Sequence, residues 1–204
     1  MENPYDAGAR DAAQINDIHW DHAFYNGRYY VYFGIVPCLL FQLPFEALTG
    51  IQNLAYAPCM VVLGLLLLAA CFGVVGQAVR RWFPQTSAAA YLLAVAAVVL
   101  GSQLYYLLVR PYIYEYAILC GAALLMLGLW LWLSAASTPV EKRGAIATKL
   151  AFGSLFVALV AGCRPQMELF AFLAVPIFWQ RYIGQKRLCS RAGAGEAAAF
   201  ILPV

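Results

Sequence analysis

Long apolar runs separated by short polar or basic breaks make up the sequence from residue 54 onward. Such runs predict membrane-spanning helices, because about 20 apolar residues cross a bilayer. The chain should form about five complete spans and a truncated sixth that begins near Gly195. The five are Leu54–Val79, Ser87–Val109, Ile113–Ala135, Leu150–Cys163 and Met167–Ile183. We therefore predict an all-α, multispanning membrane protein with a transmembrane helix bundle over residues 54–204.

The apolar stretch before the first span, Val31–Leu48, does not fit this pattern. It contains Pro37 and Pro44, each of which removes a backbone hydrogen bond from a helix, and the carboxylate of Glu46. A helix exposed to lipid tolerates such breaks poorly. Its composition leaves two readings open: an ordinary kinked transmembrane helix, or a broken helix that is re-entrant or interfacial.

Charge decides between these two readings. The chain is 64% hydrophobic and only 11% charged, whereas soluble domains carry about 25% charged residues. If Leu54–Val79 runs from outside to inside, nine of the 13 Lys and Arg residues face the cytoplasm, as the positive-inside rule favours. Residues 1–53 then form an external loop. Because Val31–Leu48 starts and ends outside, it is predicted to be re-entrant or interfacial.

The acidic residues fall mainly on the opposite, outer face: Glu2, Asp6, Asp11, Asp17, Asp21, Glu46, Glu115 and Glu168. The cations on this face are arginines, which bind phosphate and carboxylate groups bidentately. Charges at membrane depth indicate function by default. A set of carboxylates for a base or a divalent metal, with arginines for phosphate beside an apolar groove, suits a lipid-phosphate substrate.

Two arginines on this face, Arg110 and Arg164, each precede a proline at a helix end. Glu115 and Glu168 follow them just inside the next helices. The structural alternative to a binding site is a pair of salt bridges, Arg110–Glu115 and Arg164–Glu168, since charges in membranes usually pair.

Several motifs occur in order along the external loop: Asp6 in NPYDAGAR, Asn26-Gly27, Tyr29-Tyr30, Pro37 and Gly50. Over roughly residues 3–80 this order resembles the GT-C fold of polyprenyl-phosphate-sugar-dependent membrane glycosyltransferases. The protein-mannosyl and lipid A aminoarabinose transferase branch is the most similar. In that family a catalytic Asp opens the external loop. An Asn-Gly turn, an aromatic stretch and a proline-containing surface helix ending in Gly follow it.

The resemblance implies a protein of the bacterial plasma membrane with its active face outside. Its expected partners are membrane lipid and a polyprenyl-phosphate sugar donor, with no nucleic acid. That family has a span before the loop, which this chain lacks, and the chain ends within the short apolar run 197–204. We therefore expect the sequence to be a fragment.

On this resemblance Asp6 is the general base, which deprotonates the acceptor hydroxyl while polyprenyl phosphate leaves. Asp11 is the catalytic candidate if the alignment is displaced. The expected substrate-binding residues all belong to the outer face: Arg28, Tyr29, Tyr30, Arg110, Glu115 and Arg164. One of the arginines neutralises the phosphate leaving group. The alternative for Asp6 is an acid in the first turn of a helix predicted from Pro4 to about Asn16, where a carboxylate favours the helix dipole.

Other readings stay open. Asp21 and His22 are a rival site for a divalent metal, although adjacent side chains on a strand point apart and so make a poor bidentate site. A secondary transporter or flippase for a lipid-linked or anionic substrate would also have broken helices and charges at membrane depth. A non-catalytic membrane subunit is the third class.

Overall fold

A computed structural model gives the fold, and it describes Asp6, Gly8 and residues 22–26, 28–31, 34–52, 54–179 and 191–201. In these residues the chain is all-α apart from one short hairpin. Three of the described helices are long and apolar enough to cross a membrane: α4 (Tyr56–Trp82), α7 (Ile113–Ser137) and α8 (Arg143–Ala161). The predicted all-α fold built on long apolar helices is therefore confirmed.

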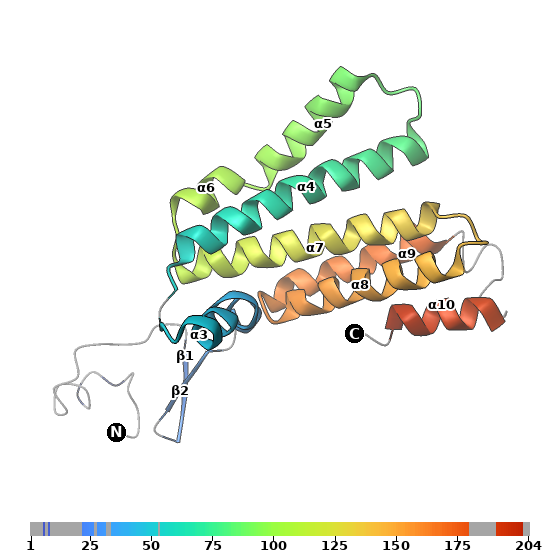
Figure 1. Ribbon diagram of the computed structural model, residues 1–204. Coiled ribbons are helices and arrows are strands. Elements are labelled where there is room, and N and C mark those ends of the chain that lie inside the picture. The colour runs from blue at the N-terminus through green and yellow to red at the C-terminus, as the bar shows by residue number, and fades with distance from the viewer. Residues whose placement is uncertain are drawn as a thin grey trace.

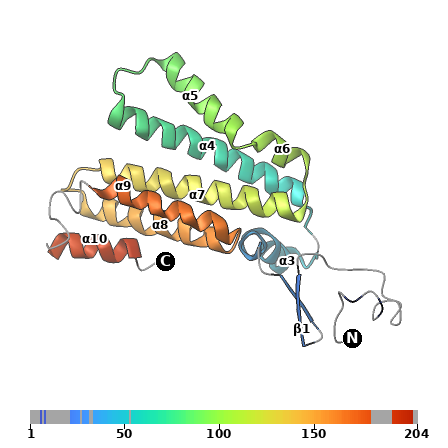
Figure 2. The same cartoon turned by 180° about the vertical axis from the view of Figure 1, so that it is seen from behind.

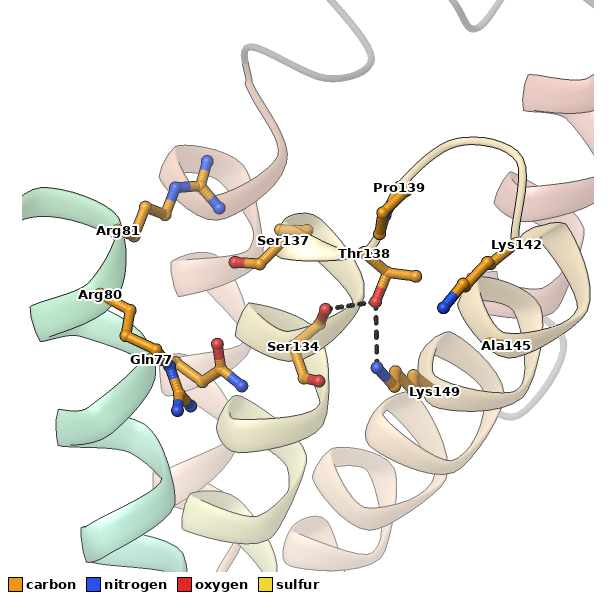
Figure 3. Close-up of a pocket in the computed structure, with 11 residues that line it drawn as sticks. Gln77, Arg80, Arg81, Ser134, Ser137, Thr138, Pro139, Lys142, Ala145 and Lys149 are labelled. Carbon is orange, nitrogen blue, oxygen red and sulfur yellow. Dashed lines mark hydrogen bonds between the residues drawn. The ribbon is translucent and has the colours of Figure 1, made fainter.

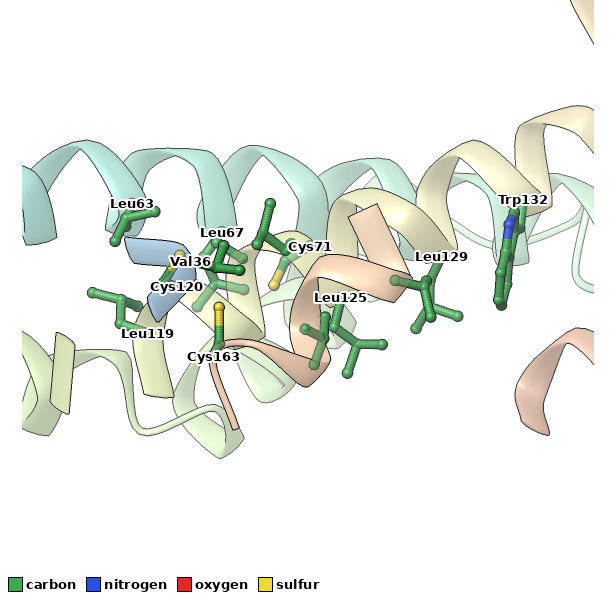
Figure 4. Close-up of a cluster of buried hydrophobic side chains, with 14 of the residues drawn as sticks. Val36, Leu63, Leu67, Cys71, Leu119, Cys120, Leu125, Leu129, Trp132 and Cys163 are labelled. Carbon is green, nitrogen blue, oxygen red and sulfur yellow. The ribbon is translucent and has the colours of Figure 1, made fainter. Parts of the chain in front are cut away.

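Helix α7 lies between α4 and α8 and runs beside both (Figures 1 and 2). Its side chains Tyr116, Leu119 and Trp132 are at most 2% exposed. A helix that is apolar all round is buried on several sides, and α7 has α4 on one side and α8 on the other. Figure 4 shows this layer, with Leu67 and Cys71 of α4 beside the α7 side chains.

Glycines allow the three helices to approach closely. A Cβ atom on Gly73 of α4 would lie 2.3 Å from the ring of Trp130 on α7, so the indole occupies the place of a side chain. A Cβ on Gly128 of α7 would lie 2.8 Å from the carbonyl oxygen of Gly153 on α8. The Trp132 indole N–H also donates to the Ser154 hydroxyl across the same interface, at 3.3 Å. Small residues at such contacts are typical of helix packing in membranes.

The predicted second span, Ser87–Val109, is not one continuous helix. It consists of α5 (Ala88–Gly101) and α6 (Leu104–Val109), separated at Gln103, which has φ 55°. Gly101 and Ser102 explain the break, because glycine is a poor helix former and serine competes for backbone partners. The Ser102 hydroxyl donates to the Val99 carbonyl at 2.7 Å. The start of the segment agrees with the prediction, since Ser87 caps α5 by accepting from the Ala90 N–H.

The later helices differ from the prediction at their ends. Helix α8 already begins at Arg143, so the loop predicted to extend to Lys149 is shorter. The predicted span Met167–Ile183 is a 3₁₀ helix, η2 (Pro165–Leu173), that continues as α9 (Ala174–Phe178). The last described helix, α10 (Arg191–Ile201), starts before Gly195 and packs on α8.

The predicted broken helix is present and lies across one end of the bundle (Figures 1 and 2). It consists of α2 (Ile35–Pro37), a π-helical segment η1 (Cys38–Gln42) and α3 (Leu43–Thr49). Pro44 explains the π turn, because it has no N–H and its ring crowds the carbonyl four residues back. The Leu43 N–H reaches back five residues to the Cys38 carbonyl instead of four. The helix ends at Gly50, which has φ 69°.

The predicted tight turn at Asn26-Gly27 connects two strands that sequence reasoning did not predict. They are β1 (His22–Tyr25) and β2 (Arg28–Val31), paired antiparallel with Tyr25 opposite Arg28. Asn26 has φ 48°, the left-handed conformation that favours asparagine in two-residue hairpin loops. The hairpin projects from the same end of the bundle as α3 (Figure 1).

The close approach of α7 and α8 predicts the effect of one substitution. We expect Gly128→Ala to lower the free energy of unfolding by about 1–3 kcal/mol, as in overpacked cores. The new methyl group would lie 2.6 Å from the Val157 side chain and 2.8 Å from the Gly153 carbonyl oxygen, a backbone atom that cannot move aside as a side chain can. Gly144→Ala is the matched control, since nothing lies within 4 Å of its Cβ position on α8. Thermal unfolding of the purified variants measures both. Equal stability of Gly128→Ala and the wild type would contradict the contact.

Candidate functional site

The end of the bundle that carries the broken helix is assembled from segments distant in sequence. The Gly34 N–H donates to the Cys163 carbonyl at 3.1 Å, and the Val36 N–H donates to the Gly162 carbonyl at 3.3 Å. These bonds attach the start of α2 to the end of α8. A Cβ on Gly162 would lie 2.6 Å from the Val36 side chain, so only glycine leaves room for this contact.

Tyr116, in the first turn of α7, holds the same helix from the other side. Its hydroxyl lies 3.0 Å from the Pro37 carbonyl and 3.0 Å from Oε1 of Gln42. One hydroxyl proton can be donated to only one acceptor. Both contacts are therefore hydrogen bonds when Tyr116 donates to the Pro37 carbonyl and the Gln42 amide turns its NH₂ toward the Tyr116 oxygen. The rings of Phe41 and Tyr56 pack on Tyr116 at 6.2 and 5.2 Å.

Arg164 lies where α8 ends and η2 begins, in an extended conformation. Its guanidinium carbon is 5.5 Å from the ring centroid of Tyr114, one residue before Glu115 on α7. A cation over an aromatic face is attracted by the ring quadrupole, so the contact with Tyr114 fixes the position of the guanidinium. The structure thus brings Arg164 and the first turn of α7 together.

Arg110 contacts Tyr106 rather than Glu115, its partner in the salt-bridge alternative. Its guanidinium donates to the Tyr106 hydroxyl and lies 5.3 Å from the centroid of the Tyr106 ring. The bond to Tyr106 raises the pKa of Arg110, with Glu115 only a minor contributor. In the described part of the chain, Arg110 and Glu115 form no salt bridge with each other, so that structural alternative is wrong.

Glu168 lies on η2 beside an apolar hollow of about 400 Å³. The residues lining it are Pro165, Glu168, Leu169, Ala171, Phe172 and Val175. Among the described residues, Oε2 of Glu168 is buried and has no hydrogen-bond partner. The Arg164–Glu168 bridge, which was the structural alternative to a binding site, is likewise absent from this part of the chain. The hollow adjoins Arg164 through Pro165, so an arginine, a carboxyl group and an apolar surface occur together here.

The remaining predicted site residues are not gathered with Arg164. Arg28, Tyr29 and Tyr30 belong to β2, in the hairpin that projects from the bundle end. Asp6 is exposed, and its Oδ1 accepts from the Gly8 N–H at 3.1 Å, the geometry of a helix cap. Gly8 is helical, so Asp6 has the hydrogen bond of a cap; the rest of the helix predicted from Pro4 to about Asn16 lies outside the described residues.

The metal prediction is not tested by the described residues. Asp11 and Asp21 lie outside them, and His22 begins β1. Within the described ranges, no group of three His, Cys, Asp or Glu side chains could hold a metal ion.

Sequence reasoning missed three residues that build this end: Gln42, Tyr114 and Tyr116. Gln42 carried a signal, because it is the one amide within an otherwise apolar stretch of the broken helix. Tyr114 and Tyr116 flank Glu115 at the start of a span, where tyrosine is typical of the membrane interface. Their partners could not be read from the sequence, since these come from segments about 50 and 75 residues away.

Comparison of the chain with protein-family models, with curated proteins and with solved structures finds no match. Its function must therefore be argued from its own residues.

The contacts of Tyr116 predict how firmly the broken helix is attached. Tyr116→Phe keeps the ring packing but leaves buried polar groups of Pro37 and Gln42 without their partner, which costs about 1–3 kcal/mol. We expect faster hydrogen exchange in residues 35–42 and a lower melting temperature. Tyr56→Phe is the control, because its ring packs on Tyr116 without a comparable hydroxyl contact in the described residues. Unchanged exchange in Tyr116→Phe would contradict the proposed attachment.

Proposed function

We propose that this chain forms the membrane part of a glycosyltransferase, which moves a sugar from a polyprenyl-phosphate donor to an acceptor at the end of the bundle that carries α2 and α3. The observation that supports this is the placement of Arg164 over Tyr114, beside the apolar hollow that contains Glu168. A polyprenyl phosphate is a long apolar chain with an anionic head. It needs an apolar surface that reaches out of the membrane and a cation where that surface ends.

The chemistry of such a transfer fits these groups. The acceptor oxygen attacks C1 of the sugar, the bond from C1 to the phosphate oxygen breaks, and the electron pair leaves with the phosphate. The acceptor proton passes to a carboxylate base. Arg164 neutralises the charge that develops on the leaving phosphate, which is electrostatic stabilisation by a group already in place. The resemblance assigns the base to Asp6, and Glu168 is the second carboxylate to consider because it lies in the hollow itself.

Substitution of Arg164 tests the phosphate role. Arg164→Gln should weaken binding of a polyprenyl-phosphate sugar by about ten-fold or more, because a hydrogen bond to a charged group contributes about 1.5–3 kcal/mol. Arg164→Lys keeps the charge but not the bidentate geometry and should be intermediate. Arg143→Gln, which removes the same charge at the other end of the bundle, is the control. Wild-type donor affinity in a folded Arg164→Gln protein would contradict the phosphate role of Arg164.

Substitution of Asp6 tests the assignment of the base. Asn still accepts the Gly8 N–H, so Asp6→Asn should keep the fold. Sugar transfer by a protein that includes this chain should fall by at least about 100-fold, the lower limit for general base catalysis. Donor binding should change little. The comparison variants are Asp11→Asn and Glu168→Gln: a loss confined to Asp11→Asn would show a displaced alignment, and a loss confined to Glu168→Gln would move the base to the hollow.

A secondary transporter or flippase is the second candidate, and the broken helices favour it. The chain has a break at Gln103 between α5 and α6 and a 3₁₀ segment in η2. Discontinuous helices form the substrate sites of many transporters. Incubation in vesicles with polyprenyl-phosphate sugars separates the classes. Sugar transfer supports the transferase, and saturable uptake without transfer supports the transporter. The absence of both activities supports a non-catalytic subunit.

A further inference from the structure

The opposite end of the bundle contains a basic hollow that the proposed function does not use. It has a volume of about 800 Å³ and lies at the ends of α4, α7 and α8. Its charged lining residues are all cations: Arg80, Arg81, Lys142 and Lys149. These residues span about 70 positions of the sequence, so the fold rather than a local basic run brings them together.

Figure 3 shows how the hollow is built. Arg80 and Gln77 come from α4 on one side. Lys149 of α8 and Lys142, the residue directly before α8, lie on the other. The last turn of α7 lies between them, where Ser134, Ser137 and Thr138 supply hydroxyl groups. The Lys149 ammonium donates to the Thr138 hydroxyl at 2.9 Å, which fixes one cation in place. The lining therefore offers several donors around one space, with the Lys149 ammonium held in place.

The cations of this hollow differ from a merely solvated basic face in two ways. No carboxylate lines the hollow, and Arg80 and Lys142 have no ion-pair partner in the described part of the chain. Arg81 donates to the Ile177 carbonyl at 3.4 Å, yet its Nη1 is buried without a hydrogen-bond partner among the described residues. Like charges gathered around one space repel each other, and an anion bound among them relieves that repulsion.

The position of the hollow indicates what the anion is attached to. It lies at the ends of three helices that are long and apolar enough to span a membrane, and therefore at the level of lipid headgroups. Phe152 follows Lys149 by three residues on α8, so both lie on the same helix face, and its ring is 51% exposed. This provides apolar surface for an acyl chain below the cations. A free phosphate ion would make no use of that surface.

We propose that this hollow binds the phosphate group of an anionic lipid headgroup, with the acyl chains along α8. Arg and Lys side chains form charge-assisted hydrogen bonds to phosphate oxygens. The Ser134 and Ser137 hydroxyls complete the set of donors, since the Thr138 hydroxyl already donates to the Ser134 carbonyl. Basic pockets between spanning helices on the cytoplasmic side are suited to phosphate-bearing headgroups, and this end carries the excess of Lys and Arg that predicts the cytoplasmic side. The site is separate from the proposed transferase site at the other end.

Mass spectrometry of the intact chain, released from detergent after incubation with phosphatidylglycerol or phosphatidylcholine at equal mole fractions, tests this proposal. We expect retention of one phosphatidylglycerol and little phosphatidylcholine. Lys142→Gln and Arg80→Gln should each weaken retention about five-fold, and the double variant about 25-fold, since one cation near an anionic lipid surface contributes about 1 kcal/mol. Both are surface residues without described partners, so the fold should persist, as thermal unfolding would verify.

Arg143→Gln is the matched control, because Arg143 is exposed and adjacent to Lys142 but does not line the hollow. An equal loss of phosphatidylglycerol retention in Arg143→Gln and Lys142→Gln would show only a general attraction between basic residues and anionic lipid, and would overturn the site. Equal retention of the two lipids would also overturn it. Inorganic phosphate is the third arm. Weak competition of phosphate with phosphatidylglycerol supports a lipid ligand. Complete displacement of phosphatidylglycerol by phosphate at the same concentration would show that the acyl chains contribute nothing and would overturn the lipid assignment.

Discussion

The packing of α7 between α4 and α8 is the constraint on which the rest of the structure depends. Lipid tails are as apolar as the helix surfaces, so burial alone does not hold such helices together, and close contact must do so. The Trp130 ring packs directly against the backbone of Gly73, and Gly128 packs against Gly153. Because α7 is held on both sides, its two ends are fixed relative to each other, and both candidate sites are built on the ends of this one helix.

The two ends differ in the chemistry that α7 presents. Its first turn carries Tyr114 and Tyr116, which hold an arginine and the broken helix. Its last turn carries serine and threonine hydroxyls beside lysines and arginines. An aromatic ring under a guanidinium leaves the cation partly desolvated and oriented, which suits one specific ligand. A set of cations and hydroxyls around one space suits a phosphate group that approaches from a lipid layer.

The sequence predicted the long helices well and their irregularities poorly. Continuous apolar runs require helices at membrane depth, so α4 and α7 appear within a few residues of their expected ranges. The break at Gln103 was missed because Gly101, Ser102 and Gln103 interrupt the apolar run only briefly, and a left-handed backbone conformation cannot be read from the sequence. The salt bridges that were the structural alternative for Arg110 and Arg164 are absent from the described residues for a related reason. Sequence spacing suggested carboxylate partners, whereas the fold places tyrosine rings closer to both arginines.

The broken helix shows how one irregularity produces the next contact. Pro44 was expected to interrupt the helix, and instead the chain widens to a π turn before it, with the Leu43 N–H bonded five residues back. A π turn rotates the residues that follow relative to a regular helix. Here the Gln42 side chain and the Pro37 carbonyl both reach the Tyr116 hydroxyl. The proline that interrupts the regular helix thus helps to attach this segment to α7, and the attached helix lies at the end of the bundle where Arg164 and Glu168 lie.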